Sequence, residues 1–270
     1  MRLKYKGKKW DKEMKEIEKN KKFFGENYLN NINWDLKKIA ESSQKDYCCF
    51  FGCLSGEYAT ISKIYVQEGD IKNVLVNTYL SALAFFVLNR LYEKGIQTNY
   101  QNIQEDLLQL EYMTGKMIAI DCYDNVQQYC KDSIIGNLFI GNMENIKKSI
   151  EQLPDNDDEL EDIYYNTPIF LKNAYIAILN KDEKGLNDAL VKRVKKYRRN
   201  MVGYSTIIDY TSIALIKVAK KYGISCDLNI IEMPDYFFEP INVEGLSALR
   251  LPLQEDANRI LKSHKKVPKR

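Results

Sequence analysis

IKNVLVNTYLSALAFFVLNRLY, residues 71–92, is the stretch that decides the fold class. Its apolar residues fall almost all round the circumference of a helix, and they do not alternate with polar residues as they would in a half-buried strand. Gly69-Asp70 precedes the stretch, and Gly95 follows it at a position where glycine ends a helix at the least cost. We therefore expect a long helix at the centre of the core.

Helical periodicity continues on both sides of this stretch, and turn-forming residues are too sparse for a many-stranded sandwich or barrel, with 6 Pro and 13 Gly in 270 residues. The segment 206–222 is the clearest amphipathic helix, with a capping box at Thr206 and Asp209 and a stop at Gly223. The expected fold is all-α, an irregular bundle of helical hairpins with roughly ten helices. Further helices are expected at 9–24, 28–42, 47–66 and 103–131.

A weak internal repeat has an offset of 40 residues, as Ile134, Leu138, Ile146 and Ile150 recur as Ala174, Ile178, Leu186 and Leu190. Each copy predicts a helical hairpin. The turn is Gly141-Asn142 in the first copy and residues 180–182 in the second, where Asn142 and Asp182 can cap the following helix. A solenoid normally contains three or more repeats, so two copies leave a partly solenoid-like stack as an alternative that the sequence does not decide.

Charge divides the chain into three expected parts. Residues 1–45 are expected to form charged helices packed on the rest, 46–255 the main helical domain, and 256–270 a basic tail with a short helix near 255–264. The net charge of +3 is too small to favour nucleic acid as the partner. The basic stretch KRVKKYRR, residues 192–199, fits the outer face of a helix, although a nucleic-acid stripe is the alternative.

Cysteine usage and the first residues favour a cytoplasmic protein. None of the six cysteines forms a C-x-x-C pair, so we expect free thiols in a reducing compartment, with Cys48, Cys49 and Cys53 buried in an apolar run. The lysine-rich start has no apolar export segment. The longest apolar stretch, residues 74–88, is too short and too often interrupted to cross a membrane.

The side-chain inventory argues against an enzyme. The one histidine, His264, lies in the basic tail, so the usual Ser/His/Asp, Cys/His and zinc designs are missing a base or ligand. The chain also contains no phosphate-binding glycine loop and no calcium loop, so we expect neither a cofactor nor a metal. A carboxylate pair is the remaining catalytic option, but a run of acids after Pro154 is more typical of an exposed helix start.

Two acidic segments are the candidate partner-binding residues. The first is the acidic block, which contains Asp155, Asp157, Asp158, Glu159, Glu161 and Asp162. The second, EMPDYFFEP, places aromatic residues between carboxylates, and its candidates are Glu232, Asp235, Tyr236, Phe237, Phe238 and Glu239. Aromatic side chains often anchor protein interfaces, yet these could equally fold back into the helical core.

Residues 167–240 resemble the immunity proteins of bacterial polymorphic-toxin systems, most closely immunity protein family forty-nine. The resemblance is carried by the hairpin NAYIAILNKDEKGLNDALVKRVKKY, the helix IDYTSIALIKVAKKYGI and the loop Pro234-Asp235-Tyr236. It implies a helical cytoplasmic protein that binds and blocks a secreted toxin made by the same cell or its kin. It brings no catalytic residue.

The expected partner is a cognate toxin domain, for example a nuclease with a basic surface, which the acidic block would steer and the aromatic residues would hold. Two other classes of function stay open. One is a helical-hairpin scaffold similar to tetratricopeptide proteins, which would bind an endogenous peptide or protein. The other is a nucleic-acid-binding regulator. Exposed aromatic residues would also serve self-association into a homo-oligomer.

Overall fold

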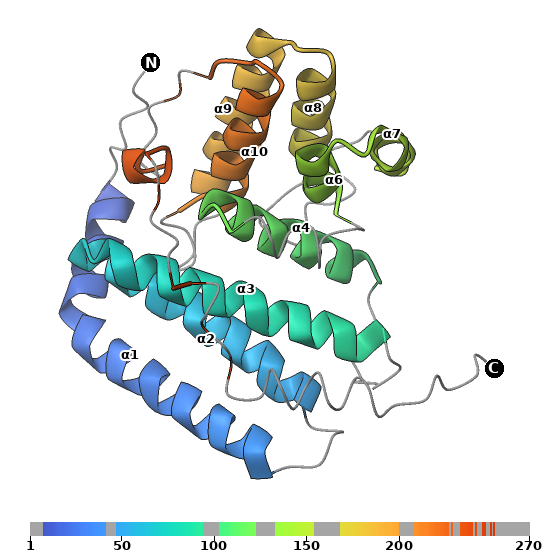
Figure 1. Cartoon of the computed structure of the whole chain (residues 1–270). Coiled ribbons are helices and arrows are strands. Elements are labelled where there is room, and N and C mark those ends of the chain that lie inside the picture. Colours follow the sequence, from blue (N-terminus) through green and yellow to red (C-terminus); the bar gives the residue numbers. More distant parts are fainter. Residues whose placement is uncertain are drawn as a thin grey trace. The chain divides into compact units, whose positions relative to one another are not determined.

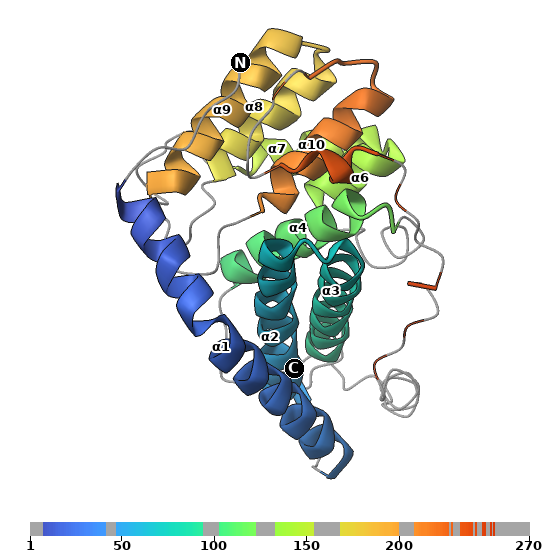
Figure 2. The same ribbon diagram turned by 90° about the vertical axis from the view of Figure 1, so that its left-hand side faces the viewer.

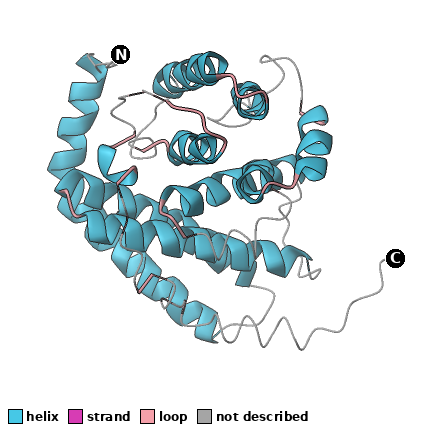
Figure 3. Cartoon of the chain, turned by 45° about the horizontal axis from the view of Figure 1, so that its top comes forward, coloured by secondary structure: helices cyan, strands magenta, loops and turns pink. Residues whose placement is uncertain are grey.

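The structure is a computed structural model, and it describes residues 8–41, 47–93, 103–122, 133–153, 168–199, 208–226 and 233–239 and single residues from 228 to 251. Every regular element in these ranges is a helix (Figure 3), which confirms the predicted all-α fold. The chain forms two compact units, the first from Met1–Glu13 with Leu107–Asn242 and the second from Met14–Asp106 with Val243–Arg270. The predicted divisions at residues 45 and 255 do not coincide with these units.

Figures 1 and 2 show the helices of each unit. The second unit holds most of α1 (Lys8–Glu41), together with α2 (Tyr47–Glu68) and α3 (Ile71–Glu93). The first unit holds most of α4 (Ile103–Ala119) and then α6 (Ile134–Ile140), α7 (Met143–Glu151), α8 (Pro168–Leu179), α9 (Glu183–Arg199), α10 (Tyr210–Lys221) and the 3-10 turn η4 (Asp235–Phe237).

Helix α1 is a single helix of 34 residues, so the prediction of two helices with a break near Gly25 is wrong. Glycine weakens a helix by about 1 kcal/mol relative to alanine but does not end one when the hydrogen bonds on both sides persist. Ile32 and Ile39 lie on the buried face of this helix, whereas Leu29 and Ala40 are exposed.

The contacts between helices α1 and α2 include a pair of rings and a pair of carboxyl groups. The rings of Trp34 and Phe50 meet edge to face with centroids 5.8 Å apart. Asp35 is only 3% exposed and hydrogen-bonds the side chain of Glu57. Burial, followed by the charge of Asp35, raises the pKa of Glu57 to about 8, so these two carboxyl groups share a proton at neutral pH.

Helices α2 and α3 form the long hairpin at the centre of the second unit, where they lie side by side (Figures 1 and 2). Residues 81–88 of α3 are all buried, as its apolar circumference predicts. The Ser55 hydroxyl donates to the Ser81 carbonyl oxygen at 2.9 Å, and the Ser81 hydroxyl donates to the Ser55 carbonyl oxygen at 2.7 Å. This reciprocal pair fixes the register of the two helices.

Helix α3 also meets the length and composition of a membrane span over Ile71–Asn89, with a mean hydropathy of 1.5. In the structure 72% of that window is buried inside the protein. The prediction that the cysteine run of α2 is buried is wrong for Cys49 and Cys53, which are exposed. The two cysteines lie one helical turn apart on the solvent-facing side of α2. The apolar composition of the run did not indicate that this side is exposed.

The internal repeat is confirmed in structural detail. All of its apolar positions are buried in the hairpins α6–α7 and α8–α9: Ile134, Leu138, Ile146, Ile150, Ala174, Ile178, Leu186 and Leu190. The N–H of Asn142 donates to the Asn137 carbonyl at 3.0 Å, and 40 residues later the N–H of Asp182 donates to Ala177 at 2.8 Å. The two hairpins therefore turn with equivalent backbone hydrogen bonds.

The same corner closes the α2–α3 hairpin. Each of the three hairpins has a left-handed residue in its corner, with φ of 70° at Gly69, 79° at Gly141 and 55° at Lys181. Gly69 and Gly141 follow their helix directly, whereas Asn180 lies between the end of α8 and Lys181. The residue after the left-handed one, Asp70, Asn142 or Asp182, accepts a hydrogen bond on its side chain from the N–H three residues later. A single two-residue corner thus ends one helix and caps the next.

Candidate partner-binding surface

The structure describes only part of the predicted site. The acidic block and Glu232 lie outside the described residues: Asp155, Asp157, Asp158, Glu159, Glu161, Asp162 and Glu232. The remaining candidates form a short turn in the first unit: Asp235, Tyr236, Phe237, Phe238 and Glu239. The geometry of the candidate surface therefore comes from this turn.

The turn is built on Pro234, whose φ of −57° and ψ of 140° set the chain up for one turn of 3-10 helix. The N–H of Phe237 donates to the Pro234 carbonyl at 3.1 Å, and the N–H of Phe238 donates to Asp235 at 2.8 Å. Successive side chains therefore point in different directions.

Phe237 points into the first unit and is fully buried, at 0% exposure. Its ring meets Tyr210 of α10 edge to face, with centroids 5.8 Å apart and planes at 84°. The ring of Tyr236 lies against it at 4.5 Å. Phe237 thus folds back into the helical core. This is the second of the two roles that the sequence left open for the aromatic residues of EMPDYFFEP.

The other side chains of the turn lie at the surface, and we refer to Asp235, Tyr236, Phe238 and Glu239 as the 235–239 surface. Asp235 and Glu239 are exposed, and Tyr236 and Phe238 are half-buried. The ammonium group of Lys220 lies 5.2 Å from the centroid of the Phe238 ring. The Tyr236 hydroxyl oxygen is covered and hydrogen-bonds nothing in the described part of the chain, and burial raises the pKa of Tyr236.

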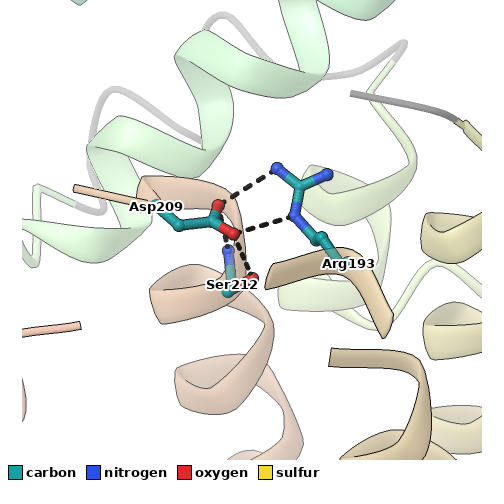
Figure 4. A network of polar contacts seen from close by, with 3 residues as sticks. All are labelled: Arg193, Asp209 and Ser212. Carbon is teal, nitrogen blue, oxygen red and sulfur yellow. Dashed lines mark hydrogen bonds and ion pairs between the residues drawn. The ribbon is translucent and has the colours of Figure 1, made fainter. Parts of the chain in front are cut away.

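A buried ion pair positions helix α10 beneath this turn (Figure 4). The guanidinium of Arg193 donates two hydrogen bonds to the Asp209 carboxylate, each at 3.0 Å, and the two side chains are 4% and 1% exposed. Asp209 also accepts from the Ser212 N–H at 3.1 Å and from the Ser212 hydroxyl at 2.6 Å. Asp209 is therefore the N-cap of α10, and the predicted helix start at Thr206 is wrong.

A second buried carboxyl, Glu111 of α4, connects three helices. It accepts hydrogen bonds from the N–H groups of Ile134 and Ile135 at the start of α6 and from the Tyr175 hydroxyl of α8 at 2.9 Å. Burial raises the pKa of Glu111 to about 7, although the hydrogen bonds from Ile135 and Ile134 oppose that rise. Because both oxygens are occupied by the protein itself, this carboxyl is a packing group and not a free base.

Lysines of α10 also serve packing. Lys217 donates to the Ala119 carbonyl at 2.8 Å and to the Asp121 carboxylate at 2.7 Å, which joins α10 to the end of α4. Lys221 donates to the Phe139 carbonyl at the end of α6 at 2.7 Å. Cations at the C-terminal ends of helices are favoured by the helix dipole. These lysines are thus engaged within the unit and add little to a surface for nucleic acid.

The described residues contain no group of three or more His, Cys, Asp or Glu side chains that could hold a metal ion. No family model, curated protein or solved structure matches the chain. The resemblance to immunity protein family forty-nine stays a prediction from the sequence. The sequence identified the 235–239 surface through its carboxylates and aromatic residues, but it did not reveal Arg193–Asp209 or Glu111, whose partners are distant in the chain.

Proposed function

We propose that the protein is an immunity protein that acts in the cytoplasm and neutralises a cognate secreted toxin by stoichiometric binding. The 235–239 surface is the observation that carries the proposal. It places two exposed carboxylates beside two half-buried aromatic rings on a turn held from inside by Phe237. The segment of the chain that resembles immunity protein family forty-nine includes this same loop.

Such a surface is suited to rapid and durable inhibition. Carboxylates attract a basic protein and raise the association rate, while aromatic side chains that become buried in the complex lower the dissociation rate. Phe237 fixes the turn before binding, so little conformational entropy is lost when the partner docks. No step of this function requires the protein to make or break a bond.

The proposal is tested by expressing the chain together with a candidate toxin domain. The unaltered chain is expected to restore growth and to co-purify with the toxin in a fixed ratio. The double variant Tyr236→Ala, Phe238→Ala is expected to lose both properties while keeping its helical circular-dichroism spectrum. Full protection by this variant would remove the 235–239 surface from the interface, and no protection by the unaltered chain would refute the function.

A matched control comes from the same unit. Ile140 and Met143 are exposed apolar residues, at 44% and 43%, on either side of the α6–α7 corner. The double variant Ile140→Ala, Met143→Ala removes two exposed apolar side chains that are not part of the 235–239 surface, so it is expected to protect and to co-purify like the unaltered chain. Equal loss in both double variants would indicate a general effect on the fold.

A second candidate is a helical-hairpin scaffold that binds an endogenous peptide or protein. It is favoured by the shared corner of the hairpins α2–α3, α6–α7 and α8–α9, because repeated helical hairpins are typical of such scaffolds. Co-expression separates the two candidates. A scaffold of this kind leaves the growth defect caused by the toxin unchanged, whereas an immunity protein removes it.

A further inference from the structure

Two cysteine side chains of α2 meet at the surface of the second unit, and neither the fold nor the proposed function uses them. Cys49 and Cys53 are four residues apart in the helix, so their side chains lie on the same side of it. Both cysteines are exposed, and the side chain of Cys53 hydrogen-bonds that of Cys49. The pair therefore presents two adjacent sulfur atoms to molecules in solution.

The helix brings the two sulfur atoms together but does not let them bond to each other without distortion. A disulfide needs Cβ atoms about 3.5–4.5 Å apart, whereas Cβ atoms one turn apart in an α-helix are about 5–6 Å apart. A single atom between the sulfurs closes this gap, because two bonds of about 2.3 Å, the length of a zinc–thiolate bond, reach across about 4 Å. The geometry favours a ligand with one thiophilic atom that bonds both sulfurs.

Two carboxyl groups near Cys53 determine which thiophilic atom suits the pair. Partial burial, followed by the charge of Asp35, raises the pKa of the Cys53 thiol to about 11, and the charge of Glu57 acts in the same direction. A soft monovalent ion such as copper(I) binds two thiolates, so it would add a negative charge beside these carboxyl groups. A trivalent arsenical avoids this cost, because its product with two thiols is uncharged.

We propose that Cys49 and Cys53 form a dithiol site that binds trivalent arsenicals, namely arsenite and its organic derivatives. Two arsenic–sulfur bonds form in place of two arsenic–oxygen bonds, and the two thiol protons leave with the displaced oxygen as water. Arsenic stays trivalent, so the reaction needs no oxidant or reductant. The helix holds the sulfurs together before binding, so closing the ring costs less entropy than in a flexible chain. This inference is independent of toxin binding.

The test titrates the folded, reduced protein with phenylarsine oxide at pH 7.4. Native mass spectrometry is expected to show a single adduct per chain, whose mass is that of the arsenical less one water. The adduct is expected to protect a pair of thiols from N-ethylmaleimide and to leave the helical circular-dichroism spectrum unchanged, because the bridge fits within one helical turn. The absence of an adduct would overturn the proposal, and so would a loss of helix on binding.

Single serine variants locate the site. Cys49→Ser and Cys53→Ser are each expected to weaken the binding of phenylarsine oxide by about a hundredfold or more, because the remaining thiol forms only one bond to arsenic. The controls are Cys48→Ser, next to the pair in the sequence, and Cys226→Ser in the first unit, and both are expected to bind like the unaltered chain. Circular dichroism checks that each variant folds. Tight binding by both Cys49→Ser and Cys53→Ser, or its loss in Cys48→Ser, would contradict the assignment.

Discussion

Tyr236 and Phe237 are adjacent in one turn, but their side chains make opposite contributions to stability. Phe237 is fully buried against Tyr210, so its ring contributes apolar burial and an edge-to-face contact. The Tyr236 ring packs on Phe237, while its hydroxyl oxygen is covered and finds no acceptor or donor among the described residues. A covered hydroxyl without a partner costs free energy.

Substitutions at these two residues are expected to have contrasting effects on stability. Phe237→Ala is expected to lower the free energy of unfolding by about 3–5 kcal/mol, because it leaves a cavity next to Tyr210. Tyr236→Phe is expected to leave it unchanged or to raise it by up to about 1 kcal/mol, because it removes only the unpaired hydroxyl. Urea denaturation followed by circular dichroism measures both. A clear loss of stability in Tyr236→Phe would mean that the hydroxyl has a hydrogen-bond partner.

Lys63, a buried lysine on α2, makes a pH-dependent contribution to stability. Its pKa is about 8 in the folded protein, against 10.5 for an ordinary lysine, so between these values the unfolded chain binds more protons and stability rises with pH. Lys63→Met is therefore expected to be more stable than the unaltered protein at pH 7, by up to about 3 kcal/mol, and this advantage should shrink as the pH approaches 10.5. Urea unfolding of both proteins at pH 7 and pH 10 measures the difference. An advantage that is the same at both pH values would contradict the low folded pKa.

At the scale of the element, the two-residue corners show what the sequence reveals well. Gly141-Asn142 was recognised because glycine tolerates positive φ and asparagine caps helices, and the offset of 40 residues then located the equivalent corner at Lys181-Asp182. The start of the basic stretch was harder to interpret. Arg193 lies between exposed lysines, and only its ion pair with Asp209 makes it a buried residue that sets the start of α10.

The corners predict opposite effects for two substitutions. Lys181 adopts a φ of 55°, which costs a residue with a Cβ atom about 1 kcal/mol, so Lys181→Gly is expected to raise the free energy of unfolding by about that amount. Gly141→Ala is expected to lower it by about 1 kcal/mol at the equivalent corner, where φ is 79° and a Cβ atom would meet no clash. Thermal and urea unfolding measure both. A stabilised Gly141→Ala would show that backbone strain does not govern these corners.

At the scale of the whole molecule, the fold class followed from composition and periodicity, because a buried helix and an amphipathic helix each leave a distinct pattern in a single sequence. Pairings between distant residues leave no such pattern. Glu111 receives its hydrogen bonds from residues more than twenty positions away, and the reciprocal bonds of Ser55 and Ser81 span 26 positions. The acidic block stays a prediction about the partner, since it lies outside the described ranges.

The charge of the 235–239 surface gives a kinetic prediction for the whole molecule. Asp235→Lys, Glu239→Lys is expected to slow association with a basic toxin domain by about tenfold or more and to weaken the salt dependence of the rate. The control Glu144→Lys, Asp188→Lys reverses two exposed carboxylates elsewhere in the first unit. Each double variant changes the net charge from +3 by four units to +7. Stopped-flow association rates at several salt concentrations distinguish a local effect from one of net charge. Equal slowing in both would assign the steering to net charge alone.

The α2–α3 hairpin affects how long apolar surface is exposed while the chain is being synthesised. Helix α3 is apolar enough to enter a lipid bilayer, and in the finished protein most of that apolar stretch is covered. Because α2 precedes α3 in the sequence, the ribosome releases α2 first, so its partner has already been synthesised when α3 emerges. The two-residue corner and the reciprocal hydrogen bonds of Ser55 and Ser81 join residues that are close in the sequence, so α3 can pack against α2 as soon as it has been synthesised. The apolar surface of α3 is then covered early, which limits its exposure to insertion machinery and chaperones.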